Sequence, residues 1–91
     1  MQVISMKYFT SIQFINPKNN ITLPCKLLGK SEIGDKCLLL DVICYEVQLV
    51  SNNIDLLSDT IFVKINHELF PVSKIDVELH EDFSNIKIHY L

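Results

Sequence analysis

The sequence contains no arginine: its basic side chains are eight lysines, set against eleven aspartates and glutamates, for a formal net charge of −3. Arginine holds phosphate and guanine through paired hydrogen bonds, and nucleic-acid surfaces are built from clustered lysine and arginine. The lysines of this chain are spread along its length. We therefore expect no nucleic-acid partner.

Glycine is also scarce, with Gly29 and Gly34 as the two examples. Phosphate-binding loops need several glycines whose backbone N–H groups approach the phosphates, so the chain carries no such loop. The Gly-x-Ser-x-Gly turn of serine hydrolases and the Cys-x-x-Cys spacing of redox and zinc motifs are missing as well. We expect a protein that is not an enzyme and that holds no cofactor.

Long apolar runs are absent, since none approaches the about 18 residues of a membrane-spanning helix. Residues 1–7 do not show a basic segment followed by an apolar signal-peptide core. The cysteines Cys25, Cys37 and Cys44 are an odd number without close spacing, which indicates reduced thiols packed as small apolar side chains. These features predict a cytoplasmic protein that does not insert into membranes.

Metal-binding spacings are missing too. The histidines His67, His80 and His89 fall in three separate segments, without the His-x-His or His-x-x-x-His pattern that places two ligands side by side. We expect ordinary surface histidines and no metal site.

What the sequence does contain is alternating apolar side chains. Hydrophobic residues make up 48% of the 91-residue chain, and their period is close to two, which is typical of strands with one buried face. The alternation predicts strands over residues 8–14, 21–27, 61–65, 69–79 and 86–90. Turn formers separate them at residues 16–20, 29–35, 66–68 and 80–82. Because Pro24 cannot donate to a ladder, we expect its strand at an edge or beside a bulge.

The segment 36–50 is too long for one ordinary strand, and strict alternation makes both of its faces apolar. A phase slip between Asp41 and Glu46 restores one apolar face, so we expect two strands joined by a bulge or tight turn. The interior side chains would then be Leu38, Leu40, Val42, Tyr45, Val47 and Leu49. Residues 51–59 are predicted to form a loop with at most one short helical turn.

Six or seven short strands with little or no helix predict a single all-β domain over residues 1–91. Short antiparallel strands bury one face each most readily by closing into a small β-barrel, which we favour over a two-sheet sandwich. Residues 1–19 are either a peripheral strand of this barrel or an arm. Because so small a domain cannot bury all of its apolar surface, we expect a protein partner or a homodimer at a sheet edge.

In this order of segments, residues 20–91 resemble a PilZ domain, a small six-stranded β-barrel of bacterial cyclic-dinucleotide and type IV pilus systems. The strand Leu23-Pro-Cys-Lys-Leu-Leu28 matches the first barrel strand of that family. The family's Asp/Asn-x-Ser-x-x-Gly motif aligns with Asp41, while Ile43 replaces the serine and Glu46 replaces the glycine. Its Arg-x-x-x-Arg motif is absent from a chain without arginine.

The resemblance implies a degenerate PilZ-like domain that does not bind cyclic diguanylate. Members of the family that do not bind the dinucleotide are protein adaptors, so the resemblance implies an adaptor in type IV pilus assembly, motility or signalling. The candidate partner-binding residues are Ile43, Tyr45, Ile54, Leu56 and Leu57.

Two alternatives remain open at this point. In the first, Lys7 or Lys18 acts with Asp41 as a noncanonical set of contacts for a nucleotide-like ligand. In the second, the chain is an unrelated small β-barrel, such as an inhibitor or immunity protein, whose function lies in a partner interface.

Overall fold

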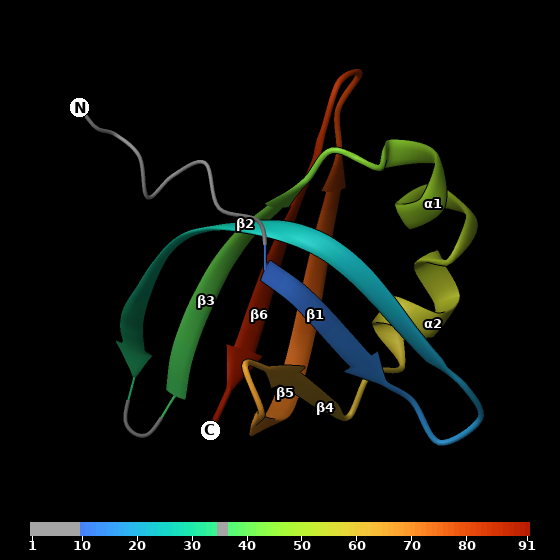
Figure 1. Cartoon of the computed structure of the whole chain (residues 1–91). Coiled ribbons are helices and arrows are strands. Elements are labelled where there is room, and N and C mark those ends of the chain that lie inside the picture. The colour runs from blue at the N-terminus through green and yellow to red at the C-terminus, as the bar shows by residue number, and fades with distance from the viewer. Residues whose placement is uncertain (1–9, 35–36) are drawn as a thin grey trace.

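The computed structural model describes residues 10–34 and 37–91, and the side chains of residues 10–31 and 38–91. Its strands are β1 (Thr10–Ile15), β2 (Asn20–Gly34), β3 (Cys37–Cys44), β4 (Phe62–Ile65), β5 (Glu68–Leu79) and β6 (Ser84–Tyr90). All neighbours are antiparallel, and the strands close into a barrel in the order β1-β2-β3-β6-β5-β4 (Figure 1). The prediction of a small all-β barrel is confirmed.

The barrel consists of two three-stranded meanders, β1-β2-β3 and β4-β5-β6. The middle strands β2 and β5 each pair with both neighbours, and the pairs β1–β4 and β3–β6 close the wall. Each middle strand has a residue left out of the ladder close to where its second partner begins, Leu28 in β2 beside β3 and Ser73 in β5 beside β6. An extra residue of this kind bends a strand, which is what a small barrel needs at its corners. The Ser73 hydroxyl donates to the backbone carbonyl of His89 at 3.1 Å, across the second bend.

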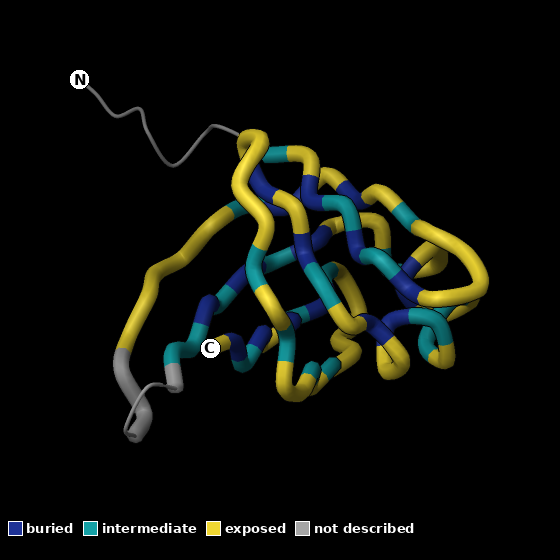
Figure 2. Tube along the Cα trace, turned by 90° about the horizontal axis from the view of Figure 1, so that it is seen from below, coloured by how far each residue is buried: buried dark blue, intermediate teal, exposed yellow. Residues whose placement is uncertain are grey.

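The core fills the barrel interior, and buried and exposed positions alternate along the strands (Figure 2). Its apolar side chains are Ile12, Phe14, Leu23, Cys25, Leu40, Val42, Cys44, Val50, Leu57, Val63, Ile65, Ile86, Ile88 and Tyr90. Burying a large apolar side chain contributes about 1.5–3 kcal/mol. This interior is therefore the main source of stability.

The segment that follows β3 is helical, so the second of the two strands predicted within residues 36–50 is wrong. The helices α1 (Val47–Asn52) and α2 (Ile54–Ser58) carry the chain from β3 to β4. Those two strands are not neighbours in the barrel, so the chain must cross between them. Helical spacing turns Val50 and Leu57 into the core, while Tyr45 and Leu49, expected inside, are 49% and 39% exposed.

The helical crossover is hydrogen-bonded to the turn between β1 and β2 through the backbone carbonyl of Leu56. Leu56 accepts the side-chain amide of Asn16 at 3.3 Å and the hydroxyl of Thr60 at 3.2 Å. Asn16 and Thr60 are both buried, and α2 lies against β2 and β5. Residues 51–59, which were predicted to form a loop with at most one short helical turn, therefore cover part of the core. No helix in the described part of the chain has the length and apolar character needed to cross a membrane.

Two further predictions concern β2. The turn expected over residues 29–35 is wrong, because β2 continues in strand form to Gly34, opposite Cys37. The bulge at Leu28 bends the strand instead. Pro24 lies opposite Ser11 of β1 and has no partner on β3, because the β2–β3 ladder starts at Lys26. A proline has no N–H to donate, so it fits a position that is paired on one side only.

β1 pairs with both β2 and β4, so it belongs to the barrel wall. The rest of the predicted arm, residues 1–9, lies outside the described residues.

Candidate functional site

The three residues aligned with the PilZ motif, Asp41, Ile43 and Glu46, do not together offer free side chains to a ligand. Asp41 and Ile43 lie half-buried on β3, and alternation places both on the outer face of the barrel. Asp41 accepts a hydrogen bond from the side-chain amide of Asn85 at 2.6 Å. Glu46 is exposed at the start of α1, where its backbone carbonyl accepts the N–H of Val50 at 3.0 Å.

The candidate partner-binding residues differ in their availability. Tyr45 is 49% exposed, and Ile43, Ile54 and Leu56 are half-buried. Leu57 has no exposed surface and belongs to the core. Leu57 is therefore unavailable to a partner of the folded domain.

The structure does not bring together the lysine and aspartate of the nucleotide alternative. Lys18 lies in the turn before Asn20, whereas Asp41 pairs with Gly29 further along β2. The strand between Asn20 and Gly29 spans roughly 30 Å at the usual rise per residue. Lys7, the other lysine of that hypothesis, lies outside the described residues.

The histidines occupy three separate places. His67 is exposed in the β4–β5 turn, His89 contacts Asp76 with a 3.0 Å Nε2–Oδ2 distance, and His80 contacts a glutamate at 2.8 Å and stacks on Phe83. Over residues 10–34 and 37–91, no three His, Cys, Asp or Glu side chains gather in a way that could hold a metal ion.

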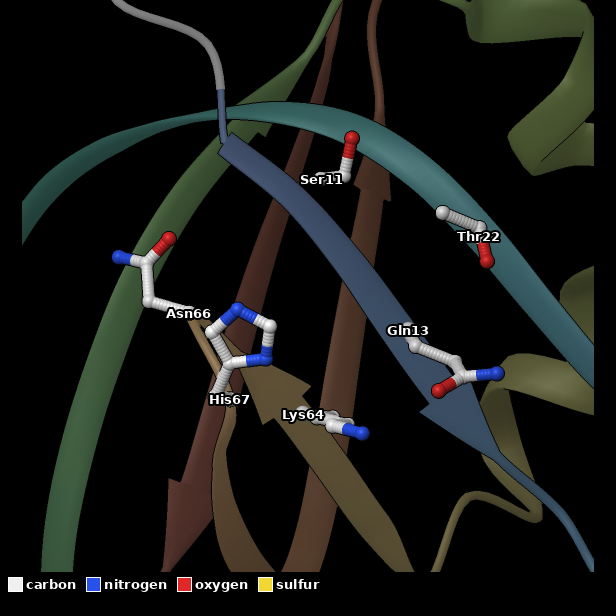
Figure 3. Close-up of a pocket in the computed structure, with 6 residues that line it drawn as sticks. All are labelled: Ser11, Gln13, Thr22, Lys64, Asn66 and His67. Atoms are coloured by element: carbon white, nitrogen blue, oxygen red, sulfur yellow. The ribbon is translucent and has the colours of Figure 1, made fainter.

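A shallow hollow of about 400 Å³ lies on the outer face of β1, β2 and β4 (Figure 3). We call it the outer hollow; it is lined by Ser11, Gln13, Thr22, Lys64, Asn66 and His67. Its lining supplies hydroxyl, amide and ammonium donors and contains no carboxylate. Asn66 and His67 form the two-residue β4–β5 turn with φ of 50° and 72°, the positive values that a tight hairpin turn requires.

A second depression, more apolar, lies on the other side of the same turn. We call it the mouth groove; it has a volume of about 200 Å³ and is lined by Leu27, Lys30, Leu40, Ile65, Asn66, Glu68, Phe70 and Tyr90. A hollow of about 350 Å³ adjoins it at Lys30 and Tyr90 and adds Ser31 and Leu38. The rings of Phe70 and Tyr90 meet edge to face with centroids 5.0 Å apart.

The mouth groove lies beside the part of β2 that follows Cys25. The β1–β2 ladder starts at the pair Thr10 and Cys25, so within the described residues β2 beyond Cys25 is paired on one edge only, by β3. This edge, which has no strand partner among residues 10–34 and 37–91, lies across the groove from the β4–β5 hairpin. The sequence alone does not reveal this site, because its residues come from five strands and meet only in the folded barrel.

Comparisons with protein-family models, curated proteins and solved structures find no significant match. A six-stranded antiparallel barrel is the architecture that the PilZ resemblance implies, but small barrels carry many unrelated functions. Function must therefore be inferred from the surface of this chain.

Proposed function

We propose that the chain is a non-catalytic binding domain that takes an extended segment of a partner protein along β2 and into the mouth groove. The observation that carries the proposal is that, among the described residues, β2 from Lys26 to Gly34 pairs with β3 alone and lies beside an apolar groove. An unpaired edge presents backbone N–H and C=O groups, and an added strand satisfies them. Leu27 and Leu28, on this part of β2, are 40% and 51% exposed.

The chemistry of the groove specifies the occupant. Leu40, Phe70 and Tyr90 supply apolar lining, while Lys30 and Glu68 add one charge of each sign. Every second side chain of an added strand points to the same face. A segment with alternating apolar side chains therefore fits best, with polar side chains between them facing solvent.

Binding a segment of a partner protein is also the role that the resemblance implies, namely that of a degenerate PilZ-like adaptor in pilus assembly, motility or signalling. Two features support an adaptor that does not bind cyclic diguanylate. Asp41, the retained motif residue, is already hydrogen-bonded to Asn85, and Ile43 and Glu46 offer neither the hydroxyl nor the glycine of the motif.

A peptide selection tests the binding site. Peptides selected from a random library against the full chain are expected to show alternating apolar residues and to protect β2 amides from hydrogen exchange. Leu27→Asp should weaken their affinity at least about tenfold, the change that 1.4 kcal/mol produces. Leu79→Asp is the matched control, because Leu79 is 44% exposed at the opposite end of β5.

Two results would contradict the proposed binding site: selected peptides that bind equally well to Leu27→Asp, or a concentration-dependent homodimer that buries the same edge.

Calorimetry with cyclic diguanylate tests the proposal that the domain does not bind this dinucleotide. We expect no binding heat, and saturable binding would show that the missing arginines and serine do not prevent recognition.

A further inference from the structure

Two of the three cysteines face each other inside the barrel. Lys26 of β2 lies opposite Ile43 of β3, and one further step along this register sets Cys25 opposite Cys44. Both side chains are fully buried and therefore point to the same face. Residues directly opposite in an antiparallel pair have Cα atoms about 4.5–5.5 Å apart, within the roughly 4.4–6.8 Å that a disulfide spans.

The two thiols are chemically unequal. The Cys25 thiol donates a hydrogen bond to the Cys44 sulfur, which raises the pKa of Cys25 and lowers the pKa of Cys44 to about 7. A backbone hydrogen bond from Glu46 also lowers the pKa of Cys44, whereas burial and the Glu46 carboxylate oppose this effect. Cys44 is therefore the nucleophilic member of the pair, and Cys25 keeps its proton.

We propose that Cys25 and Cys44 form a redox-modification site that hydrogen peroxide converts into an intramolecular disulfide. The Cys44 thiolate sulfur bonds to one peroxide oxygen, the O–O bond breaks, and hydroxide leaves to give a sulfenic acid. The Cys25 sulfur then bonds to the Cys44 sulfur, the S–O bond breaks, and the hydroxyl leaves as water with the Cys25 proton. In total the two thiols lose two electrons and two protons, and the peroxide is reduced to two waters.

The burial of the site selects a small oxidant. Because neither sulfur has exposed surface, a bulky oxidant such as a peptide disulfide reaches the pair only if the strands separate.

Ser84 lies opposite Cys44 on β6 and is also fully buried. Its hydroxyl has no hydrogen-bond partner in the described structure, so it is free to donate to the oxygen that Cys44 carries after the first step.

Peptide mapping of the wild-type chain tests the proposal without relying on a cysteine variant to fold. The reduced protein is treated with hydrogen peroxide, its free thiols are alkylated, and it is digested without reductant for mass spectrometry. We expect a linked pair of peptides containing Cys25 and Cys44, with Cys37 alkylated, and full reversal by dithiothreitol. The disulfide should raise the melting temperature by roughly 10 °C, because it closes a loop of the unfolded chain.

The Cys37→Ser variant is the matched control and should give the same linked pair. Disulfides that contain Cys37, a Cys44 that stops at sulfinic acid, or a pair that stays reduced while Cys37 is oxidised would each overturn the proposal. Ser84→Ala should slow disulfide formation severalfold with the same end product. An unchanged rate would overturn the contribution assigned to Ser84.

Discussion

The side-chain amide of Asn85 on β6 donates to the Asp41 carboxylate on β3 at 2.6 Å and to the backbone carbonyl of Val42 at 3.1 Å. These bonds cross the seam between the two meanders, where β3 pairs with β6. Asp41 and Asn85 are both half-buried. The residue that matches the PilZ motif therefore has a structural partner within its own chain.

Removing this carboxylate should weaken the seam. Asp41→Ala is expected to lower the free energy of unfolding by about 1–3 kcal/mol, because it removes a hydrogen bond to a charged group. Urea unfolding measures the change, with Glu81→Ala in an exposed turn as the control. Equal stability of the two variants would mean that the Asn85 bond contributes nothing.

The crossover helices should behave as part of the core. Leu57→Ala is expected to lower the free energy of unfolding by about 2–5 kcal/mol, because a fully buried side chain is replaced by a cavity. Leu49→Ala, at a position that is 39% exposed, should cost less than about 1 kcal/mol. Equal effects in urea unfolding would argue that α2 does not pack on the barrel.

The cysteine pair predicts a pH dependence of stability. The pKa of Cys44 is about 7 in the folded chain, against 9.0 for an unperturbed thiol. Between these values the folded state has released a proton that the unfolded state retains, so stability should rise with pH by at most about 1.4 kcal/mol per unit. Above pH 9.0 the sign reverses, since the pKa of Cys25 is raised in the folded state and the unfolded thiol ionises first.

Urea unfolding of Cys37→Ser under reducing conditions, from pH of about 6 to about 10, measures this profile. The third thiol is removed so that it does not contribute. Cys44→Ser should abolish the rise, and an equally steep rise in that variant would assign the effect to another group.

The β4–β5 turn holds a residue in a conformation that side chains disfavour. His67 has a φ of 72°, and glycine adopts this region without a steric penalty. His67→Gly should therefore stabilise the domain by about 1 kcal/mol, measured as a higher urea midpoint. Asn66→Gly is the comparison, with a smaller expected gain because asparagine tolerates positive φ. A less stable His67→Gly variant would indicate that the imidazole makes a contact that outweighs the strain.

The alternation of apolar and polar residues was sufficient to predict most strands of the barrel and which of their side chains point inward. Alternation along Ile86, Ile88 and Tyr90 predicts a strand with these three side chains inside, and all three are buried. The reason is that the side-chain direction in a strand follows from the backbone, so one buried face is readable from spacing alone. The same alternation, combined with the short length of the segments, predicted the closed all-β architecture.

Residues 45–50 show where local pattern is insufficient. Tyr45, Val47 and Leu49 alternate as a strand would, yet the segment is helical from Val47 onward. Because β4 pairs with β1 and β5 rather than with β3, the chain must leave the sheet after Cys44 and cross to β4. Burial of Val50 and Leu57 in the core then outweighs the strand pattern.

The mouth groove and the cysteine pair depend on strand register and closure, which composition and spacing do not contain. Cys25 and Cys44 lie far apart in sequence, and only the β2–β3 register brings them opposite each other. The groove likewise brings together Leu27 of β2 and Phe70 of β5. The amino-acid pattern thus specifies which side chains turn inward, whereas the pairing of distant strands specifies which of them meet.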